Sequence, residues 1–128
     1  LMSTHGDMRD IMLNFAREVQ LLRDLGAKDI ILDPGFGFGK TLEQNYTLLD
    51  NMEQLQTFNL PILVGASRKS MIFKLLGTSP AEAQNGTSVI NTISLMKGAS
   101  ILRVHDVKEC VEVVKLVRML KQQESGKH

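Results

Sequence analysis

Apolar residues follow two spacings in this chain, and the two spacings alternate along the sequence. Short continuous runs of mainly β-branched or aliphatic residues lie at 30–32, 62–64 and 100–104, as expected for strands that are buried on both faces. Around these runs, apolar residues recur every third or fourth position, which predicts amphipathic helices. The pattern indicates a repeated unit of one strand followed by one helix.

Capping residues mark the first two predicted helices. Asp7 is the expected N-cap of a helix over 8–25, and Gly26 is the expected residue after its end. Thr41 and Gln44 have the spacing of a capping box at the start of the second helix. The second helix is predicted to bury Tyr46, Leu49, Met52 and Leu55, and to end at Asn59 and Pro61.

The second half of the chain shows similar signals after a short predicted helix over 71–76. Ser79 and Glu82 form another capping-box pattern, with proline between them at the first helical position, which predicts helical structure as far as Lys97. Asp106, with an acidic residue three positions on, is the expected N-cap of the last helix. The predicted buried face of that helix comprises Val107, Val111, Val114 and Val117, with Leu120 as a further candidate. Residues 122–128 are polar, and we expect a disordered tail there.

The order of elements predicts an α/β fold with parallel strands, because strand-helix-strand crossovers are right-handed. Residues 1–3 look like the end of a further strand that precedes the first helix. A (β/α)₈ barrel takes about 250 residues, so residues 1–121 correspond to about half of one. The alternative is a free-standing open sheet, which would leave both edges of four short strands uncovered.

Composition narrows the function only slightly. The chain has 128 residues, 43% hydrophobic and 23% charged, and its 15 basic residues are balanced by 14 acidic ones. This balance is typical of a soluble globular protein and argues against a nucleic-acid or membrane surface. The single cysteine, Cys110, has no partner for an internal disulfide. With no apolar run of membrane-spanning length and no signal-peptide pattern, we expect a cytoplasmic protein.

A glycine-rich stretch, DPGFGFGKT at 33–41, follows the first strand directly. A phosphate-binding loop of the G-x-x-x-x-G-K-[ST] type would need a glycine at Pro34, and a dinucleotide-binding fingerprint would need one at Lys40. Both patterns fail by one residue. The glycines therefore need another explanation.

Chemistry in parallel α/β folds gathers at the carboxyl ends of the strands. Three polar clusters fall at such ends, at 33–40, 67–70 and 103–106. Alternation along the third strand places Arg103 and His105 on the side opposite Leu102 and Val104. One carboxylate, several cations and a phenylalanine at one rim suit a ligand with an anionic group, a flat ring and an amidine-like N–H edge.

The motifs DPGFGFGK at 33–40, GASRKS at 65–70 and RVHD at 103–106 resemble, in order and near their spacing, the three C-terminal signatures of dihydropteroate synthase. The resemblance covers about residues 1–120 and implies the C-terminal half of that family's TIM barrel. The family is a transferase of bacterial folate biosynthesis and the target of sulfonamides. It joins 6-hydroxymethyl-7,8-dihydropterin pyrophosphate to p-aminobenzoate, which gives 7,8-dihydropteroate and pyrophosphate.

The resemblance also implies a role for individual residues. Pterin contacts would come from Asp33, Gly37, Lys69 and Met2. Contacts to p-aminobenzoate would come from Phe38, Arg68 and Ser70, and contacts to pyrophosphate from Arg103 and His105. Phe36 is predicted to pack in the core instead.

In the family the C–O bond is thought to ionise first, after which the aromatic amine captures the pterin cation. The resemblance therefore implies no nucleophile and no strong general base. Magnesium is the implied cofactor, with its ligand in the N-terminal half of the barrel and none in this chain. That half also supplies an aspartate, an asparagine and two mobile loops, so we expect no turnover from this chain alone. A homodimer joined through the last two helices is implied as well.

Two alternatives remain open, and one segment departs from the family pattern. Where the family usually reads Leu-Met-His-Met, this chain has LMSTH at 1–5, so His5 is not equated with the family's histidine. A pterin-binding methyltransferase-type module would share the barrel and the aspartate, but would not need Arg68-Lys69 or Arg103-x-His105. A phosphate-binding α/β regulatory domain built on GFGKT is the other alternative.

Overall fold

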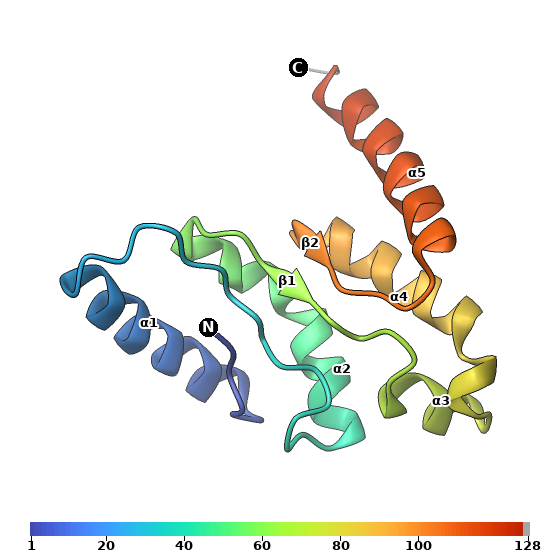
Figure 1. Cartoon of the computed structure of the whole chain (residues 1–128), viewed down its shortest axis with the longest axis horizontal. Helices are drawn as coiled ribbons and strands as arrows, with labels where there is room; N and C mark the ends of the chain where they lie inside the picture. Colours follow the sequence, from blue (N-terminus) through green and yellow to red (C-terminus); the bar gives the residue numbers. More distant parts are fainter. Residues whose placement is uncertain (127–128) are drawn as a thin grey trace.

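The structure is a computed structural model that describes residues 1–126, and Figure 1 shows the course of the chain. Its elements are, in order, α1 (Met8–Asp24), α2 (Leu42–Asp50), the 3₁₀ helix η1 (Met52–Phe58), β1 (Leu63–Val64), α3 (Ser70–Leu76), the 3₁₀ turn η2 (Pro80–Glu82), α4 (Gln84–Met96), β2 (Ile101–Leu102) and α5 (Val107–Ser125). Across residues 1–126, none of the helices combines the length and the apolar character needed to traverse a lipid bilayer.

The strands are parallel and lie in chain order, as predicted. Leu63 pairs with Ile101 and Val64 pairs with Leu102 in the β1–β2 ladder. Two isolated parallel bridges extend this arrangement, Leu32 to Ile62 and Met2 to Asp33. The predicted strand end at residues 1–3 is therefore confirmed.

The regular ladder is shorter than predicted, because it covers Ile101–Leu102 instead of 100–104. Arg103 still donates its backbone N–H to the Val64 carbonyl at 2.9 Å. The partner strand β1 ends at Val64, so the ladder does not extend further.

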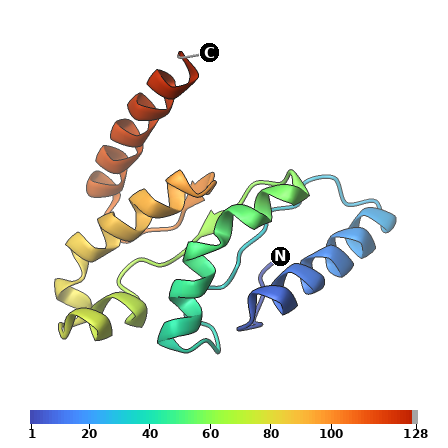
Figure 2. The same ribbon diagram turned by 180° about the vertical axis from the view of Figure 1, so that it is seen from behind.

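The helices cover one side of the strand layer. Figure 1 shows the strands in front of α2 and α4, and Figure 2, turned by 180°, shows the helices in front. Along the strands, Leu32, Ile62 and Val64 are completely or almost completely buried, whereas Ile31 and Ile101 keep 41% and 36% of their surface exposed. This alternation indicates that one side of the sheet packs on the helices and the other side is open.

Local helix signals in the first half are confirmed. The Asp7 carboxylate accepts a hydrogen bond from the Arg9 N–H and caps α1, and Gly26, at φ +92°, follows the end of the helix. Both bonds of the Thr41 and Gln44 capping box are present at the start of α2.

The second predicted helix is interrupted at Asn51. The Asn51 side-chain amide donates to the Thr47 carbonyl at 2.8 Å, and the Asn51 backbone N–H donates to the same carbonyl at 3.1 Å. The chain continues as η1 and ends at Asn59 in the left-handed region, as predicted. Of the predicted inner face, Leu49, Met52 and Leu55 are buried, and Tyr46 is half-buried, with its hydroxyl donating to the Met71 carbonyl at 2.6 Å.

The prediction of a second capping box at Ser79 was wrong. The Ser79 side chain caps no backbone N–H, Pro80–Glu82 forms a 3₁₀ turn, and α4 starts only at Gln84. The carbonyls of Pro80 and Ala81 accept hydrogen bonds from Arg68 at 2.9 and 3.0 Å. Because these two carbonyls point toward Arg68, they are not hydrogen-bonded as in an α-helix, and the α-helix starts after them.

The last helix differs from the prediction at its start. The Asp106 side chain does not cap α5, because both of its carboxylate oxygens accept hydrogen bonds from Arg68.

The predicted buried face of α5 was also partly wrong. Val107, Val111 and Leu120 are 65%, 45% and 49% exposed, and the buried residues are Val113 and Val117. Lys121 donates to the Leu95 carbonyl of α4 at 2.7 Å, and the helix extends away from the rest of the molecule in Figure 1. The neighbour α4 therefore decides which side of α5 is covered.

The predicted tail is helical over its first part. α5 runs through Ser125, so residues 122–125 are an exposed last turn of the helix. Residues 127 and 128 of the predicted tail lie outside the described residues.

Candidate functional site

The loops after β1 and β2 meet at the carboxyl ends of the strands. A small pocket of about 110 Å³ lies there, lined by Gly65, Ser67, Lys69, Arg103, Val104 and His105. Three of the residues predicted from the sequence, one lysine, one arginine and one histidine, therefore line the same space.

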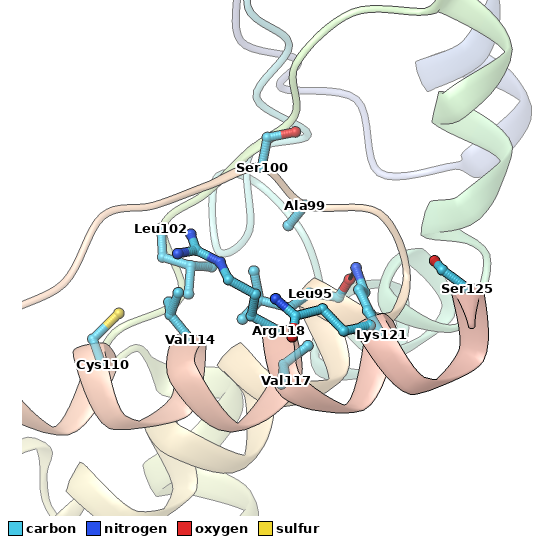
Figure 3. Close-up of a pocket in the computed structure, with 11 residues that line it drawn as sticks. Leu95, Ala99, Ser100, Leu102, Cys110, Val114, Val117, Arg118, Lys121 and Ser125 are labelled. Carbon is cyan, nitrogen blue, oxygen red and sulfur yellow. Dashed lines mark hydrogen bonds between the residues drawn. The ribbon is translucent and has the colours of Figure 1, made fainter.

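A larger cavity lies elsewhere and is lined by none of the predicted site residues. It has a volume of about 570 Å³ between the end of α4, β2 and α5. Figure 3 shows Leu102, Val114 and Val117 around it, with Arg118 and Lys121 reaching from α5. The polar groups that follow the strands converge on the smaller pocket instead.

Asp33 is half-buried at the end of the second strand segment. Its Oδ1 accepts a hydrogen bond from the Gly35 N–H at 2.8 Å, and within residues 1–126 its Oδ2 has no hydrogen-bond partner. One oxygen therefore holds the glycine-rich loop, and the other is available to a ligand.

Two residues that were not predicted as site residues also hold the glycine-rich loop. The Lys40 ammonium donates to the Gly35 carbonyl at 2.7 Å, and the buried Asn45 of α2 accepts from the Gly37 N–H at 2.8 Å. Burial lowers the pKa of Lys40, partly opposed by the negative charge of Asp33. A polar residue at position 45, on the same helix face as the apolar Leu48 and Leu49, is the sequence signal that could have identified Asn45.

The backbone of this loop argues against the phosphate-binding alternative. The N–H groups of Gly35, Gly37 and Phe38 all donate to protein oxygens, from Asp33, Asn45 and the Gly35 carbonyl. A phosphate cradle needs such groups to be free for the ligand.

Lys69 connects the first and second motifs. Its ammonium donates to the Phe36 carbonyl at 2.6 Å and lies 4.5 Å from the centre of the Phe38 ring, within the range of a cation–π contact. Desolvation lowers the pKa of Lys69, with Arg103 acting in the same direction and Asp33 opposing both. The charges of Asp33 and Arg103 therefore both act on the Lys69 ammonium.

The glycines Gly37 and Gly65 make room for the long cations. At Gly37, in the left-handed region with φ +88°, an added Cβ would lie 3.3 Å from the Lys69 Cδ. At Gly65 an added Cβ would lie 2.5 Å from the Arg103 Nη2. Within residues 1–126 the Arg103 side chain makes no hydrogen bond or ion pair, so its guanidinium is uncommitted.

His105 is held by the preceding loop. Its Nδ1 lies 2.8 Å from the hydroxyl oxygen of the buried Ser67, and its backbone N–H donates to the same oxygen at 3.2 Å. The imidazole itself is exposed on the pocket side.

Arg68 is committed to the protein. Its guanidinium makes a bidentate pair with Asp106, at 2.8 and 3.0 Å, and also donates to the Pro80 and Ala81 carbonyls. The hydrogen bonds from Arg68 lower the pKa of Asp106. Arg68 thus ties together the loops that follow β1 and β2 and the turn before α4, so little of its hydrogen-bonding capacity is left for a ligand.

The remaining predicted residues lie around this rim. Phe38 is 44% exposed and Phe36 is buried in the core, as predicted for Phe36. Ser70 is the first residue of α3, and its hydroxyl has no hydrogen-bond partner in the described part of the chain. Met2 is 41% exposed and pairs with Asp33 through the backbone.

No group of three histidine, cysteine, aspartate or glutamate side chains within residues 1–126 is arranged to hold a metal ion.

Comparisons with known proteins agree with the resemblance seen in the motifs. The sequence profile described as "Pterin binding enzyme" matches residues 4–105. Dihydropteroate synthase of Escherichia coli is 50% identical over 93 residues, which are 73% of this chain and 33% of that protein. The enzyme of a Synechocystis species is 42% identical over 118 residues, 90% of this chain and 40% of that protein.

Solved structures show the same relationship in three dimensions. Yersinia pestis dihydropteroate synthase superposes with a TM-score of 0.89 at 44% identity, over 95% of this chain and 57% of that one. A Xanthomonas albilineans dihydropteroate synthase with 4-aminobenzoic acid gives a TM-score of 0.89 at 28% identity, over 94% of this chain and 48% of that one.

These matches confirm the fold as a partial TIM barrel, and the chain spans between a third and somewhat over half of the length of these relatives. The family profile begins just after the first strand segment and reaches His105 in the third motif. The chain belongs to the family of pterin-binding enzymes and is related to the dihydropteroate synthases.

Proposed function

We propose that this chain supplies the C-terminal part of the active site of a dihydropteroate synthase. The observation that carries the proposal is the convergence of Lys69, Arg103 and His105 on one pocket, with Asp33 acting on the same lysine. The relationship to enzymes of that name supports it.

The pterin would be held from one edge by Asp33. A guanidine-like N–H edge matches a carboxylate that has a free oxygen, and hydrogen bonds to a charged acceptor are the stronger kind. Gly37 would let the backbone approach the flat ring, Lys69 would reach its carbonyl side, and Met2 would pack against it.

The p-aminobenzoate would lie on the exposed ring of Phe38, with its carboxylate on Ser70. The free hydroxyl of Ser70 supports this placement. Arg68 would act on this substrate mainly by fixing the loop that carries Lys69 and Ser70, because Asp106 and two carbonyls occupy its guanidinium.

Arg103 and His105 would bind the diphosphate that leaves. The uncommitted guanidinium of Arg103 can match two phosphate oxygens. As the C–O bond ionises, the two cationic or polar groups would stabilise the charge that develops on the leaving group, while Asp33 would hold the electron-rich pterin. No residue of this chain is assigned as a nucleophile or a general base.

Magnesium is the cofactor that we propose for the complete enzyme, with its ligand in the N-terminal half of the barrel. No step proposed for this chain depends on the metal. A cytoplasmic location and a homodimer joined through α4 and α5 complete the proposal.

A chimera tests the proposed function. The matching segment of the Escherichia coli relative would be replaced by residues 1–121 of this chain, and the purified protein assayed for dihydropteroate formation. We expect turnover by the chimera and none by the 128-residue chain alone. A folded chimera without activity would contradict the proposed function, and turnover by the isolated chain would contradict the expected need for a partner segment.

Asp33→Asn in the chimera tests the pterin contact. The neutral amide cannot accept two hydrogen bonds from the N–H edge as a carboxylate does, so we expect the Kd for the pterin pyrophosphate to rise by about a hundredfold. Isothermal titration calorimetry measures this change. Asp29→Asn, which alters an exposed aspartate before the same strand segment, is the matched control and should leave the Kd unchanged.

A further inference from the structure

We propose that Ser67 is a positioning residue that fixes His105 as the Nε2–H tautomer, so that the imidazole presents a hydrogen-bond donor to an anionic oxygen in the strand-end pocket. The inference rests on the proposed function, because it deepens the role of His105 at the leaving diphosphate. Ser67 itself would contact neither substrate nor product in this role.

Two contacts between the same pair of residues carry the inference. The Ser67 hydroxyl oxygen lies 2.8 Å from the Nδ1 of His105 and accepts the backbone N–H of His105 at 3.2 Å. Ser67 is 6% exposed, so its hydroxyl is largely shielded from water. The two residues are 38 positions apart and belong to the loops after β1 and β2.

The hydrogen-bonding capacity of serine decides between the two neutral tautomers. A hydroxyl has one donor and can accept twice, and the backbone N–H of His105 can only donate. If Nδ1 carried the proton, the hydroxyl would accept twice and its own proton would need another acceptor. Residues 1–126 provide no further acceptor for it. If Nδ1 is unprotonated, the hydroxyl donates to it and every group in the contact is satisfied.

The contact at Nδ1 determines what the other ring nitrogen, Nε2, presents to a ligand. With Nδ1 accepting from Ser67, the proton of the neutral imidazole is on Nε2, so the ring offers a donor whether it is neutral or cationic. Without Ser67, the neutral ring can take the other tautomer and turn a lone pair toward an anionic ligand. A donor at Nε2 would then be guaranteed only when the ring is protonated.

Charged groups around His105 also affect the binding of an anion, and they do so independently of the Ser67 hydroxyl. Arg103 and Lys69 line the same pocket as cations, and Asp106, next in sequence, is paired with Arg68. These groups remain in a Ser67 variant. A change in the pH dependence of anion binding on removal of the hydroxyl therefore reports on the imidazole itself.

Nuclear magnetic resonance of histidine labelled with ¹⁵N gives the direct test. The long-range couplings between the ring nitrogens and carbon-bound protons show which nitrogen carries the proton. His105 would be assigned by His105→Gln, in the 128-residue chain and in the active chimera. We expect an unprotonated Nδ1 and a protonated Nε2 at neutral pH. A protonated Nδ1 in the unmodified protein would overturn the inference.

The affinity for inorganic pyrophosphate provides the second test. Ser67→Ala is expected to weaken binding by about tenfold at about pH 8 and to change it little at about pH 5, because a neutral ring needs Ser67 to keep its proton on Nε2, whereas a ring with a proton on both nitrogens donates without Ser67. Ser100→Ala, which removes an exposed hydroxyl outside the site, is the control and should bind as the unmodified chimera does at both pH values.

The outcomes separate this inference from the proposed function. An active chimera in which Ser67→Ala keeps the same pH profile of pyrophosphate affinity would refute the positioning role and leave the function intact. An inactive but folded chimera that shows the expected tautomer, lost on Ser67→Ala, would refute the function and leave the Ser67–His105 pair established. Equal weakening of binding at both pH values would mean a structural role and would also overturn the inference.

Discussion

Three cationic side chains at the strand ends differ in how many of their hydrogen-bond donors are already bound to other groups of the protein. Arg68 donates four hydrogen bonds to Asp106 and two carbonyls. Lys69 is partly used by the Phe36 carbonyl and the Phe38 ring, and Arg103 is uncommitted within the described residues. The first therefore organises the loops, whereas the third keeps its hydrogen-bonding capacity for a ligand. Residue type alone did not reveal this difference.

Gly65→Ala tests whether the space beside the strand sets the position of Arg103. An added Cβ would lie 2.5 Å from the end of the flexible Arg103 side chain, so the guanidinium would move and the backbone would not. We expect affinity for pyrophosphate to fall by about tenfold, as for the loss of one charge-assisted hydrogen bond. Calorimetric titration of the chimera measures it.

The control for that substitution is Gly126→Ala. An added Cβ there meets only ordinary contacts at 3.4 Å and beyond, and the residue lies at the end of α5. If Gly65→Ala and this control bind pyrophosphate with equal affinity, the space at Gly65 does not set the position of Arg103.

At the scale of elements, the sequence predicted a helix cap correctly where the capping side chain bonds only to nearby backbone. The prediction failed at Asp106, where a residue distant in sequence binds the capping side chain. Asp7 and Thr41 each bond to an N–H two or three residues on. Asp106 has the same local pattern, but Arg68, 38 residues earlier, takes its carboxylate. Two charge-assisted hydrogen bonds from one guanidinium are stronger than a single hydrogen bond from a backbone N–H. The carboxylate of Asp106 therefore pairs with Arg68 and does not cap the helix.

The Arg68–Asp106 pair predicts a pH dependence of stability. The pKa of Asp106 is lowered in the folded protein, so its contribution is fully present above the ordinary aspartate range, near about pH 4. That contribution is lost as the pH falls below this range toward the lowered pKa of the folded state. We expect Asp106→Asn to lower the Tm at neutral pH, and the difference from the unmodified protein to shrink on acidification.

Thermal unfolding of the chimera at a series of pH values checks this prediction. Asp29→Asn is the control, because Asp29 is exposed and makes no side-chain hydrogen bond in the described part of the chain. A Tm difference for Asp106→Asn that stays constant down to the acidic end of the series would show that the carboxylate charge is not what stabilises the loops.

At the scale of the whole molecule, the arc of strands leaves apolar surface uncovered. Ile31, Ile101 and Met2 are 36–41% exposed on the open side of the sheet, and a cavity of about 570 Å³ lies between β2 and α5 (Figure 3). The relatives matched by this chain are roughly twice as long, because the 93 matched residues make up only 33% of the Escherichia coli protein. A complete barrel would cover this side of the sheet.

The exposed side of α5 leads to a prediction about assembly. Leu116 and Met119 are 74% and 58% exposed on this helix, and apolar side chains at such density favour a protein contact. If the proposed homodimer uses α5, Leu116→Lys in the chimera should convert a dimer to a monomer without a change in the circular dichroism spectrum. Light scattering coupled to size exclusion measures the mass.

Leu13→Lys is the matched control for that experiment, since Leu13 is 53% exposed on α1. It should leave the dimer intact. A Leu116→Lys protein that remains dimeric would place the contact elsewhere, and a monomeric unmodified chimera would contradict the proposed homodimer.

The sequence by itself determined the order of the elements, the parallel strands, the residues at their carboxyl ends and the local caps, because each depends on periodicity or on neighbours a few positions apart. It did not reveal the roles of Lys40, Asn45 and Ser67, or the capture of Asp106 by Arg68. The partners of Ser67 and Arg68 lie up to 38 residues away, and no local pattern encodes them. Only the tertiary structure decided which polar groups the protein consumes and which it leaves for a ligand, because hydrogen-bonding capacity is shared among groups that meet only after the chain has folded.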